Sequence, residues 1–250
     1  MVNQIKDSPS LLTRSIFEST QQVILDAEFF NRGALLLIDK PAGWTSFDVV
    51  NKIRRVTKCG KVGHCGTLDP FATGLLLIVT GSATKRADEF SCEDKVYRAD
   101  FVLGKSTDTL DRDGKLMEER IVEPFELSRI HEVCSQFIGE IEQVPPAFSA
   151  IKVNGKPAYK YARRGQEVGL ASRRVTIKSF RLLSYQHPVL AVHVECSKGT
   201  YIRALARDLG SRLGCGAYVE QLRRIQSGSF HVNESMQLEN FVNAVSTPKC

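Results

Sequence analysis

Residues 63–79, GHCGTLDPFATGLLLIV, place one carboxylate in a tight glycine-bounded loop just before a strongly apolar run. The run LLLIV predicts a strand buried on both faces, and such a strand is a rigid mount for the loop before it. Gly63 and Gly66 permit backbone geometries that larger residues resist, while Pro70 biases Asp69 away from helix. Two interpretations stay open on this local evidence. Asp69 forms an ordinary Asp-Pro turn, or it is a carboxylate presented for chemistry, and the local pattern alone favours the turn.

The composition is that of a globular protein and permits a nucleic-acid partner. The chain has 250 residues, 42% of them hydrophobic, which is enough to bury a large core in one extended domain or two small ones. We expect one catalytic domain. The formal charge of +6 and the pI near 8.9 are a modest basic excess that supports RNA binding without proving it.

Cysteine usage and the lack of targeting signals indicate a reducing compartment. Seven cysteines are scattered without a CxxC pair, which argues against a secreted disulfide framework. There is no basic start followed by a long apolar stretch, and no run of about 18 apolar residues that would span a membrane. We therefore expect a cytoplasmic protein.

The pattern of elements predicts an α+β fold with a largely antiparallel mixed sheet flanked by helices. Strands are expected at 34–39, 75–79, 97–103 and 222–230, and a hairpin at 175–185 and 189–196. Helices are expected at 11–30, 46–56 capped by Ser46, 82–90 capped by Ser82, 127–137 and 201–213, with a short one ending near Val245. The Ser, Thr and Asp-rich segment between Gly104 and Gly114 is a loop whose acidic residues form turns.

The motif GHCGTLDPFATGLL resembles the signature of the TruB family of tRNA pseudouridine synthases. A short motif is weak evidence, but further blocks of the family follow in order. They are LIDKPAGWTS at 37–46, KVYR at 95–98, PPAFSAIKVNGKPAYKYAR at 145–163, CSKGTYIR at 196–203 and CGAYVEQLRR at 215–224. Together they cover about residues 33–245, which is the chain apart from its N-terminal segment.

The resemblance implies the pseudouridine synthase fold over residues 33–245, with an RNA-gripping insertion near 143–173. Residues 1–32 form an N-terminal extension of open role, and residues 246–250 form a tail. Many members of the family carry a C-terminal PUA domain, and we expect none after residue 245 of this chain. The expected consequence is weaker tRNA binding with a steeper loss in salt than in a longer relative.

The resemblance places Asp69 on the family's catalytic aspartate. Making pseudouridine breaks the bond from ribose C1′ to N1 of uracil, rotates the base and joins C1′ to C5, so neither a redox group nor another cofactor is expected. A carboxylate can attack C1′ or C6, or stabilise charge developing on the sugar. By the same resemblance Arg203 pairs with Asp69 and keeps it ionised.

Four further residues are candidate contacts to a flipped-out nucleotide. The resemblance places Tyr97 against the base, where its phenol could also accept a proton, whereas the strand pattern alone favours an edge-of-core aromatic. His64 is an RNA contact by resemblance, or a loop histidine bonded to backbone. Tyr201 as a substrate contact and Leu222 as an apolar wall of the uracil pocket rest on the resemblance.

Lys40, Lys85 and Lys152 lie in or beside the matched blocks and are candidate phosphate contacts, although each alone is also a common solvated charge. No metal is expected, because the cysteines near His64 lack paired metal-ligand spacing and the zinc deaminase pattern is missing.

The leading interpretation is an isomerase that forms pseudouridine in the T arm of tRNA, at position 55 in the usual tRNA numbering, and acts as a monomer. A non-catalytic tRNA-folding chaperone is the alternative from another class. A pseudouridine synthase acting on another RNA is the third.

Overall fold

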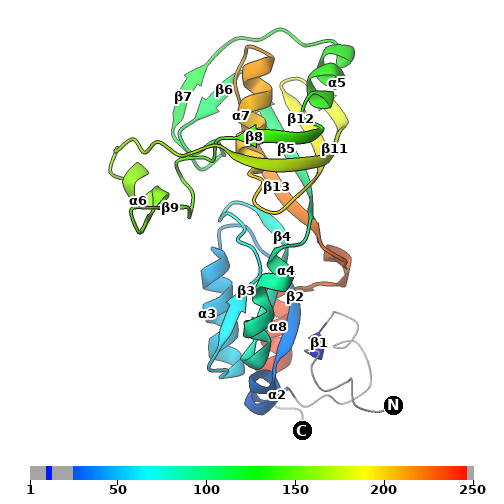
Figure 1. The fold of residues 1–250 in the computed structure, drawn as a ribbon. Coiled ribbons are helices and arrows are strands. Elements are labelled where there is room, and N and C mark those ends of the chain that lie inside the picture. The colour runs from blue at the N-terminus through cyan, green and yellow to red at the C-terminus, as the bar shows by residue number, and fades with distance from the viewer. Residues whose placement is uncertain (1–9, 13–24, 247–250) are drawn as a thin grey trace. The chain divides into compact units, whose positions relative to one another are not determined.

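The structure is a computed structural model that describes residues 10–12 and 25–246. It divides the chain into two compact units (Figure 1). Unit 1 comprises residues 1–95 and 223–250, and unit 2 comprises residues 96–222. The stretch expected to be one catalytic domain therefore contributes to two units, and the first of them is assembled from both ends of the chain.

The sheet of unit 1 is built on two central strands, β2 (Ala34–Lys40) and β4 (Thr73–Thr80), which pair antiparallel. Strand β3 (Val62–His64) pairs with β4, and the short strands β1 (Ser10–Leu12) and β15 (Met236–Gln237) both pair in parallel with β2. Strand β13 (Ala217–Ser227) adds its C-terminal part alongside β4 and continues into β14 (Phe230–His231). The predicted strand after Gly74 is thus confirmed as a buried central strand.

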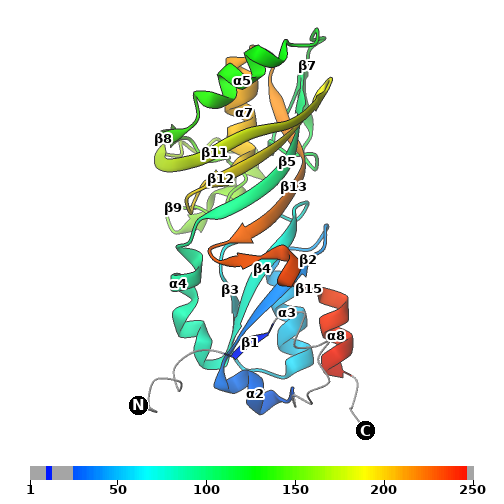
Figure 2. The ribbon, with the colours of Figure 1, turned by 90° about the vertical axis from the view of Figure 1, so that its right-hand side faces the viewer.

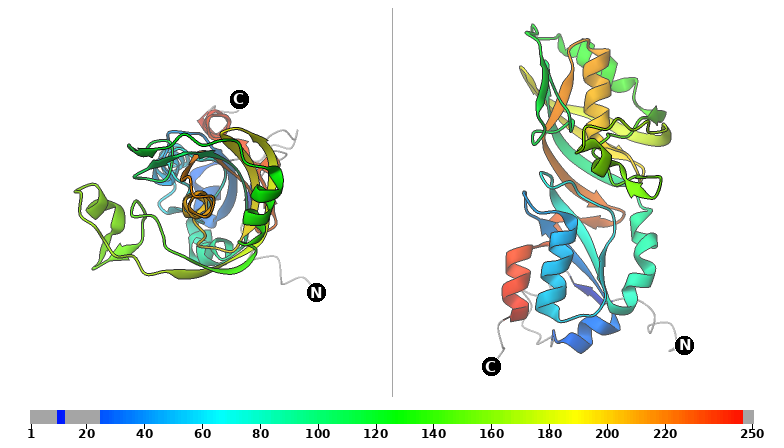
Figure 3. Two further views of the ribbon diagram at one scale, coloured as in Figure 1. Left: turned by 90° about the horizontal axis from the view of Figure 1, so that it is seen from above. Right: turned by 90° about the vertical axis from the view of Figure 1, so that its left-hand side faces the viewer.

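Helices cover this sheet. They are α2 (Ala27–Arg32), α3 (Ser46–Thr57), α4 (Ala87–Ser91) and α8 (Leu238–Ser246), with the 3-10 helices η1 (Gly81–Arg86) and η2 (Val232–Glu234). Helices α3 and α8 lie side by side (Figures 2 and 3). Phe30 of α2 meets Phe241 of α8 edge to face, with ring centroids 6.2 Å apart. The two ends of unit 1 therefore share one core.

Unit 2 holds a sheet in the order β13, β5 (Lys95–Leu103), β12 (Val189–Cys196), β11 (Arg173–Gln186) and β8 (Gly139–Gln143). The two longer helices of this unit are α5 (Leu127–Ser135) and α7 (Ile202–Arg212). The predicted hairpin is confirmed as antiparallel β11 and β12. A separate antiparallel pair is formed by β6 (Lys105–Thr107) and β7 (Leu116–Glu119), and β6 lies inside the segment expected to be only loop.

The predicted insertion stands away from the sheet of unit 2 (Figures 1 and 3). It contains the two-residue strands β9 (Lys152–Val153) and β10 (Lys156–Pro157), followed by α6 (Ala158–Ala162). Such short elements leave much of its backbone in turns.

The expected α+β class with a mixed, largely antiparallel sheet is confirmed, but several expected ends are wrong. Thr45, not Ser46, caps α3, because its side chain and that of Asp48 form a reciprocal capping box. Ser82 caps no helix and instead donates to the Arg32 carbonyl from within η1. Leu11 lies in β1, not in a helix, and residues 13–24 of that expected helix lie outside the described residues.

Candidate active site

Asp69 sits in a turn of unit 1 immediately before β4. The Ala72 amide donates to the Asp69 carbonyl at 3.1 Å, which closes the turn with Pro70 at its second position. The side chain of Asp69 is half-buried. Gly66 has a φ of +93°, so this glycine is required by the backbone, whereas Gly63 lies outside the left-handed region. The turn predicted from the sequence is the device that presents the carboxylate.

Hydrogen bonds fasten this turn to the first residue of α3 and to the loop before that helix. Ser46 Oγ donates to the Leu68 carbonyl at 3.1 Å and accepts from the Leu68 amide at 2.9 Å. The Pro70 carbonyl accepts from the Gly43 amide at 2.9 Å. Because the buried Ser46 hydroxyl bonds to Leu68, the neighbouring Thr45 provides the N-cap of α3 instead.

Lys40 also joins the Asp69 turn to the loop before α3. Its Nζ donates to the carbonyls of Pro41, Trp44 and Pro70 at 2.8, 2.7 and 3.2 Å, and its side chain is fully buried. Burial lowers the pKa of Lys40 to about 8, and the Asp69 carboxylate partly opposes that shift. All three ammonium protons are used within the protein. The expectation that Lys40 contacts a phosphate is corrected, because its role is to hold the Asp69 turn.

Arg224 supports the same turn from β13 and was not singled out in the sequence. It is 1% exposed, and it donates from Nε to the Leu75 carbonyl at 2.7 Å and from Nη2 to the Gly66 carbonyl at 3.1 Å. Both acceptors flank the Asp69 turn. Only the adjacent arginines in the QLRR sequence hint at this role, and a pair of arginines is equally typical of a surface strand.

His64 ends β3, so it is a strand residue rather than the loop residue expected as one alternative. Its Nδ1 atom is buried and has no hydrogen-bond partner among the described residues. Burial, followed by the positive charge of Arg224, lowers the pKa of His64 below its usual range. The imidazole is therefore neutral near pH 7, and its ring can pack against a base without carrying charge.

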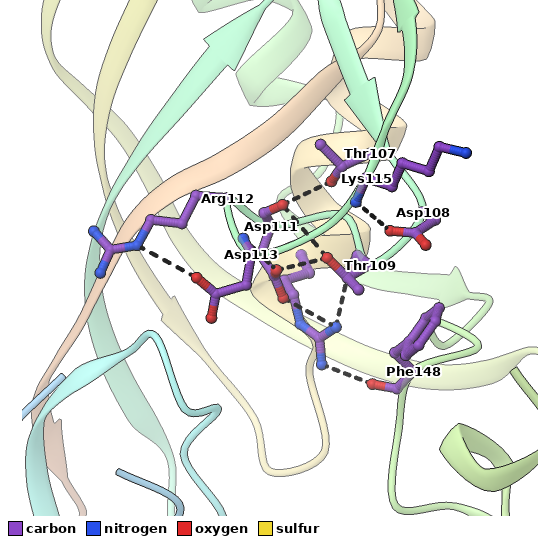
Figure 4. A network of polar contacts seen from close by, with 9 residues as sticks. Thr107, Asp108, Thr109, Asp111, Arg112, Asp113, Lys115 and Phe148 are labelled. Atoms are coloured by element: carbon purple, nitrogen blue, oxygen red, sulfur yellow. Dashed lines mark hydrogen bonds and ion pairs between the residues drawn. The ribbon is translucent and has the colours of Figure 1, made fainter. Parts of the chain in front are cut away.

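Arg203 lies in the first turn of α7 in unit 2, where the structure gives it a carboxylate partner, Asp111. Arg203 Nη1 lies 3.4 Å from Asp111 Oδ2 and donates to the Thr109 carbonyl at 2.8 Å, and Nη2 donates to the Phe148 carbonyl at 3.0 Å. Figure 4 shows the loop side chains that surround these contacts. The side chains of Arg203 and Asp111 are 4% and 8% exposed. Because the planar guanidinium of Arg203 is bonded on several sides, its orientation is fixed.

Asp111 was expected only as a turn former. It does form a turn, because Oδ1 accepts from the Asp113 amide at 3.1 Å and from Thr109 Oγ1 at 2.6 Å (Figure 4). Its burial and its approach to Arg203 go beyond that role. The sequence signal was weak because Asp108, Asp111 and Asp113 share one short loop, and nothing in their order says which one faces inward.

The remaining aromatic and apolar candidates all belong to unit 2. Tyr97 lies on β5 and is 9% exposed, and Leu222 lies on β13 and is 7% exposed. Tyr201 precedes α7, where its backbone amide and carbonyl are both bonded by the Gln143 side chain at 2.8 and 3.1 Å. The guanidinium of Arg173 lies 4.4 Å from the centre of the Tyr201 ring. That ring face is already covered by a cation.

The other two candidate lysines are exposed. Lys85 lies in η1 and Lys152 in β9. Across residues 10–12 and 25–246, no group of three or more His, Cys, Asp and Glu side chains could hold a metal ion. No helix in these ranges is long and apolar enough to cross a membrane.

Two family models together match most of the chain. "TruB family pseudouridylate synthase (N terminal domain)" matches residues 54–202, and "tRNA pseudouridylate synthase B C-terminal domain" matches residues 203–249. A relative from Endomicrobium trichonymphae, named tRNA pseudouridine synthase B, is 47% identical over 86% of this chain and 94% of its own length. One of the same name from Parabacteroides distasonis is 45% identical over 84% of this chain and 92% of its own length.

Solved structures support the fold. A chain in a Cbf5-Nop10-Gar1 complex is 28% identical with a TM-score of 0.68, over 87% of this chain and 56% of that one. A chain of an H/ACA RNP bound to a substrate RNA containing 2′-deoxyuridine is 26% identical with a TM-score of 0.63, over 84% and 52%. This protein spans about half the length of those chains. On the family models and the curated relatives, the chain belongs to the TruB family of pseudouridylate synthases.

Proposed function

We propose that this protein isomerises uridine to pseudouridine in tRNA, and that its target is the T arm at position 55. Its curated relatives are named tRNA pseudouridine synthase B. The observation that carries the proposal is the Asp69 turn. The side chains of Lys40, Ser46 and Arg224 are buried and each donates a hydrogen bond that fixes this turn, which presents one half-buried carboxylate.

In the proposed reaction, Asp69 supplies the nucleophile or the countercharge while the bond from C1′ to N1 breaks. No oxidant or external group is needed, because substrate and product are isomers. The neutral ring of His64, with its unbonded Nδ1, suits packing against RNA at the edge of the flipped nucleotide. Tyr97, Tyr201 and Leu222 as contacts to that nucleotide, and Arg203 as the partner of Asp69, are part of the proposal.

The test is chemical. Purified protein is incubated with a T-arm stem-loop, and pseudouridine is assayed in the RNA. We expect conversion by the wild type and a loss of at least roughly 1000-fold in Asp69→Asn, since the amide cannot act as a nucleophile. RNA binding by Asp69→Asn should persist, because the two side chains have the same shape. A wild type that binds the stem-loop without forming pseudouridine would favour the chaperone alternative.

A further inference from the structure

A cavity of about 670 Å³ lies in unit 1 beside Lys40, and most of its lining residues take no part in fixing the Asp69 turn. Trp44 and Lys52 lie on the α3 side of it, Asp39, Thr73 and Arg223 on the sheet side, and α8 closes it with Glu239 and Asn243. Its volume is in the range of pockets that hold small organic ligands.

The cavity lies next to the Asp69 turn through shared backbone. Lys40 Nζ joins the Trp44 carbonyl to the Pro70 carbonyl, at 2.7 and 3.2 Å. Thr73 lies four residues after Asp69, at the start of β4. A ligand in this cavity would therefore sit one short loop away from the carboxylate that we propose as the nucleophile.

The cavity lining offers the flat ring of Trp44 and the positive charge of Lys52. Trp44 is 37% exposed, which is unusual for so large an apolar ring. Arg223 is paired with Asp39 at 2.7 and 3.0 Å, so these two charges largely offset each other. Lys52 has no ion-pair partner among the described residues, whereas the exposed Glu239 adds one negative charge at the rim. The amide side chains of Gln237 and Asn243 also line the cavity and could bond to a base edge.

We propose that this cavity holds a second nucleotide of the RNA substrate, with its base stacked on Trp44 and its phosphate near Lys52. An indole platform next to a cation is how proteins hold single-stranded RNA, because every base has a face to stack and every linkage has a charge. The inference rests on the proposed function for the identity of the RNA. It adds a subsite that grips the strand beside the reacting uridine.

The chain carries its own probe, because Trp44 is its single tryptophan. Emission from Trp44 is followed while the T-arm stem-loop is added to the Asp69→Asn protein, which holds the RNA without turnover. We expect a base stacked on the indole to quench the emission at saturation. Abasic substitutions are then placed one at a time along the RNA, and emission should return at one or two positions other than the target uridine.

A matched control moves the indole. The double variant Trp44→Phe with Phe47→Trp places it on the exposed side of α3, at a residue that is 62% exposed and does not line the cavity. We expect its emission to be insensitive to the abasic positions. Lys52→Ala should weaken binding and lower the salt slope by about one, while Lys58→Ala, an exposed lysine outside the cavity, should do less.

The outcomes separate this inference from the proposed function. Unchanged Trp44 emission with bound and convertible RNA overturns the inference alone. Quenching without pseudouridine formation by the wild type overturns the proposed function alone, and RNA that does not bind overturns both. Equal quenching by uridine 5′-monophosphate at similar concentrations would make the cavity a mononucleotide site and overturn its assignment to the RNA strand.

Discussion

At the scale of single residues, the polar groups that fix the candidate site are buried, and each is held by partners distant in sequence. Arg203 and Asp111 are 92 positions apart yet lie 3.4 Å from each other. The sequence could single out Asp69 as a candidate, because a glycine-bounded loop before an apolar strand is a local pattern and the resemblance places Asp69 on the family's catalytic aspartate. It could not identify Asp111 or Arg224, because their roles depend on which way a loop or strand residue faces in the folded chain.

Asp111→Ala should destabilise the protein markedly. It would remove the carboxylate that lies 3.4 Å from the guanidinium of Arg203, whose side chain is 4% exposed. Breaking a buried pair by removing one partner costs about 3–5 kcal/mol. We expect the free energy of unfolding in urea to fall by about 3 kcal/mol. Asp108→Ala is the control, since Asp108 is exposed and its side chain accepts from the Lys115 amide. Similar losses from both variants would contradict a special role for Asp111.

Lys40 predicts a pH dependence of stability. Its pKa is about 8 in the folded protein against an ordinary value of 10.5, so the folded chain releases this proton at lower pH than the unfolded chain. Its contribution to the free energy of unfolding is therefore present above pH 10.5 and is lost as pH falls through about 8.

Urea unfolding of wild type and Lys40→Met at pH 8 and pH 10 tests this sign. Between pH 8 and pH 10, the free energy of unfolding of the wild type should rise by about 2 kcal/mol relative to that of the variant. One pKa unit corresponds to about 1.4 kcal/mol. Lys85→Met, at an exposed lysine, should show no such relative change. A wild type that loses stability relative to Lys40→Met as pH rises would overturn the assignment.

At the scale of elements, strands and helices with strong periodicity were predicted well, and their ends less so. The hairpin of β11 and β12 follows from alternation, and the buried β4 follows from its apolar run. The expected strand from Leu222 starts five residues too late, because β13 begins at Ala217. Short strands such as β1 and β6 carry too few residues for a pattern, and only their pairing partners define them.

Gly74 is the residue on which the pairing of β4 with β13 depends. Its φ is +102°, and a Cβ there would lie 2.3 Å from the Arg224 carbonyl oxygen. Gly74→Ala therefore meets both backbone strain and a clash that no side-chain rotation relieves. Gly139 has nearly the same φ of +103° but open space around it, so Gly139→Ala isolates the strain.

We expect Gly139→Ala to lower the free energy of unfolding by about 1–2 kcal/mol and Gly74→Ala by at least about 2 kcal/mol more. Thermal unfolding of both variants measures the difference. Because Arg224 also holds the Gly66 carbonyl, Gly74→Ala should reduce pseudouridine formation as well. Equal destabilisation by the two substitutions would show that the backbone of β13 shifts to make room for the added methyl group.

At the scale of the whole molecule, the division into units is the feature that the sequence least revealed. The family blocks run in order along the chain and suggest one continuous domain, but unit 1 takes residues from both ends while unit 2 is continuous. A composition shift would mark a boundary between consecutive domains. None accompanies a boundary that falls inside β5 and β13.

This division predicts how the chain responds to truncation. A protein ending at residue 222 lacks the part of β13 that pairs with β4, together with β15 and α8. It loses the buried side chains of Arg224 and Phe241, which are both 1% exposed. Unit 1 should then open, because Phe30 and the β2 edge lose their cover, whereas unit 2 keeps its full chain.

Hydrogen exchange measured peptide by peptide should show this as lost protection in β2 and β4 with protection retained in β11 and β12. A chain ending at residue 246 keeps every described element and serves as the control. Protection retained in β2 and β4 after truncation at 222 would mean that residues 25–95 hold their own core. Loss of protection in all four strands would mean that the two units unfold in one cooperative transition. Unit 2 would then not be stable without a folded unit 1.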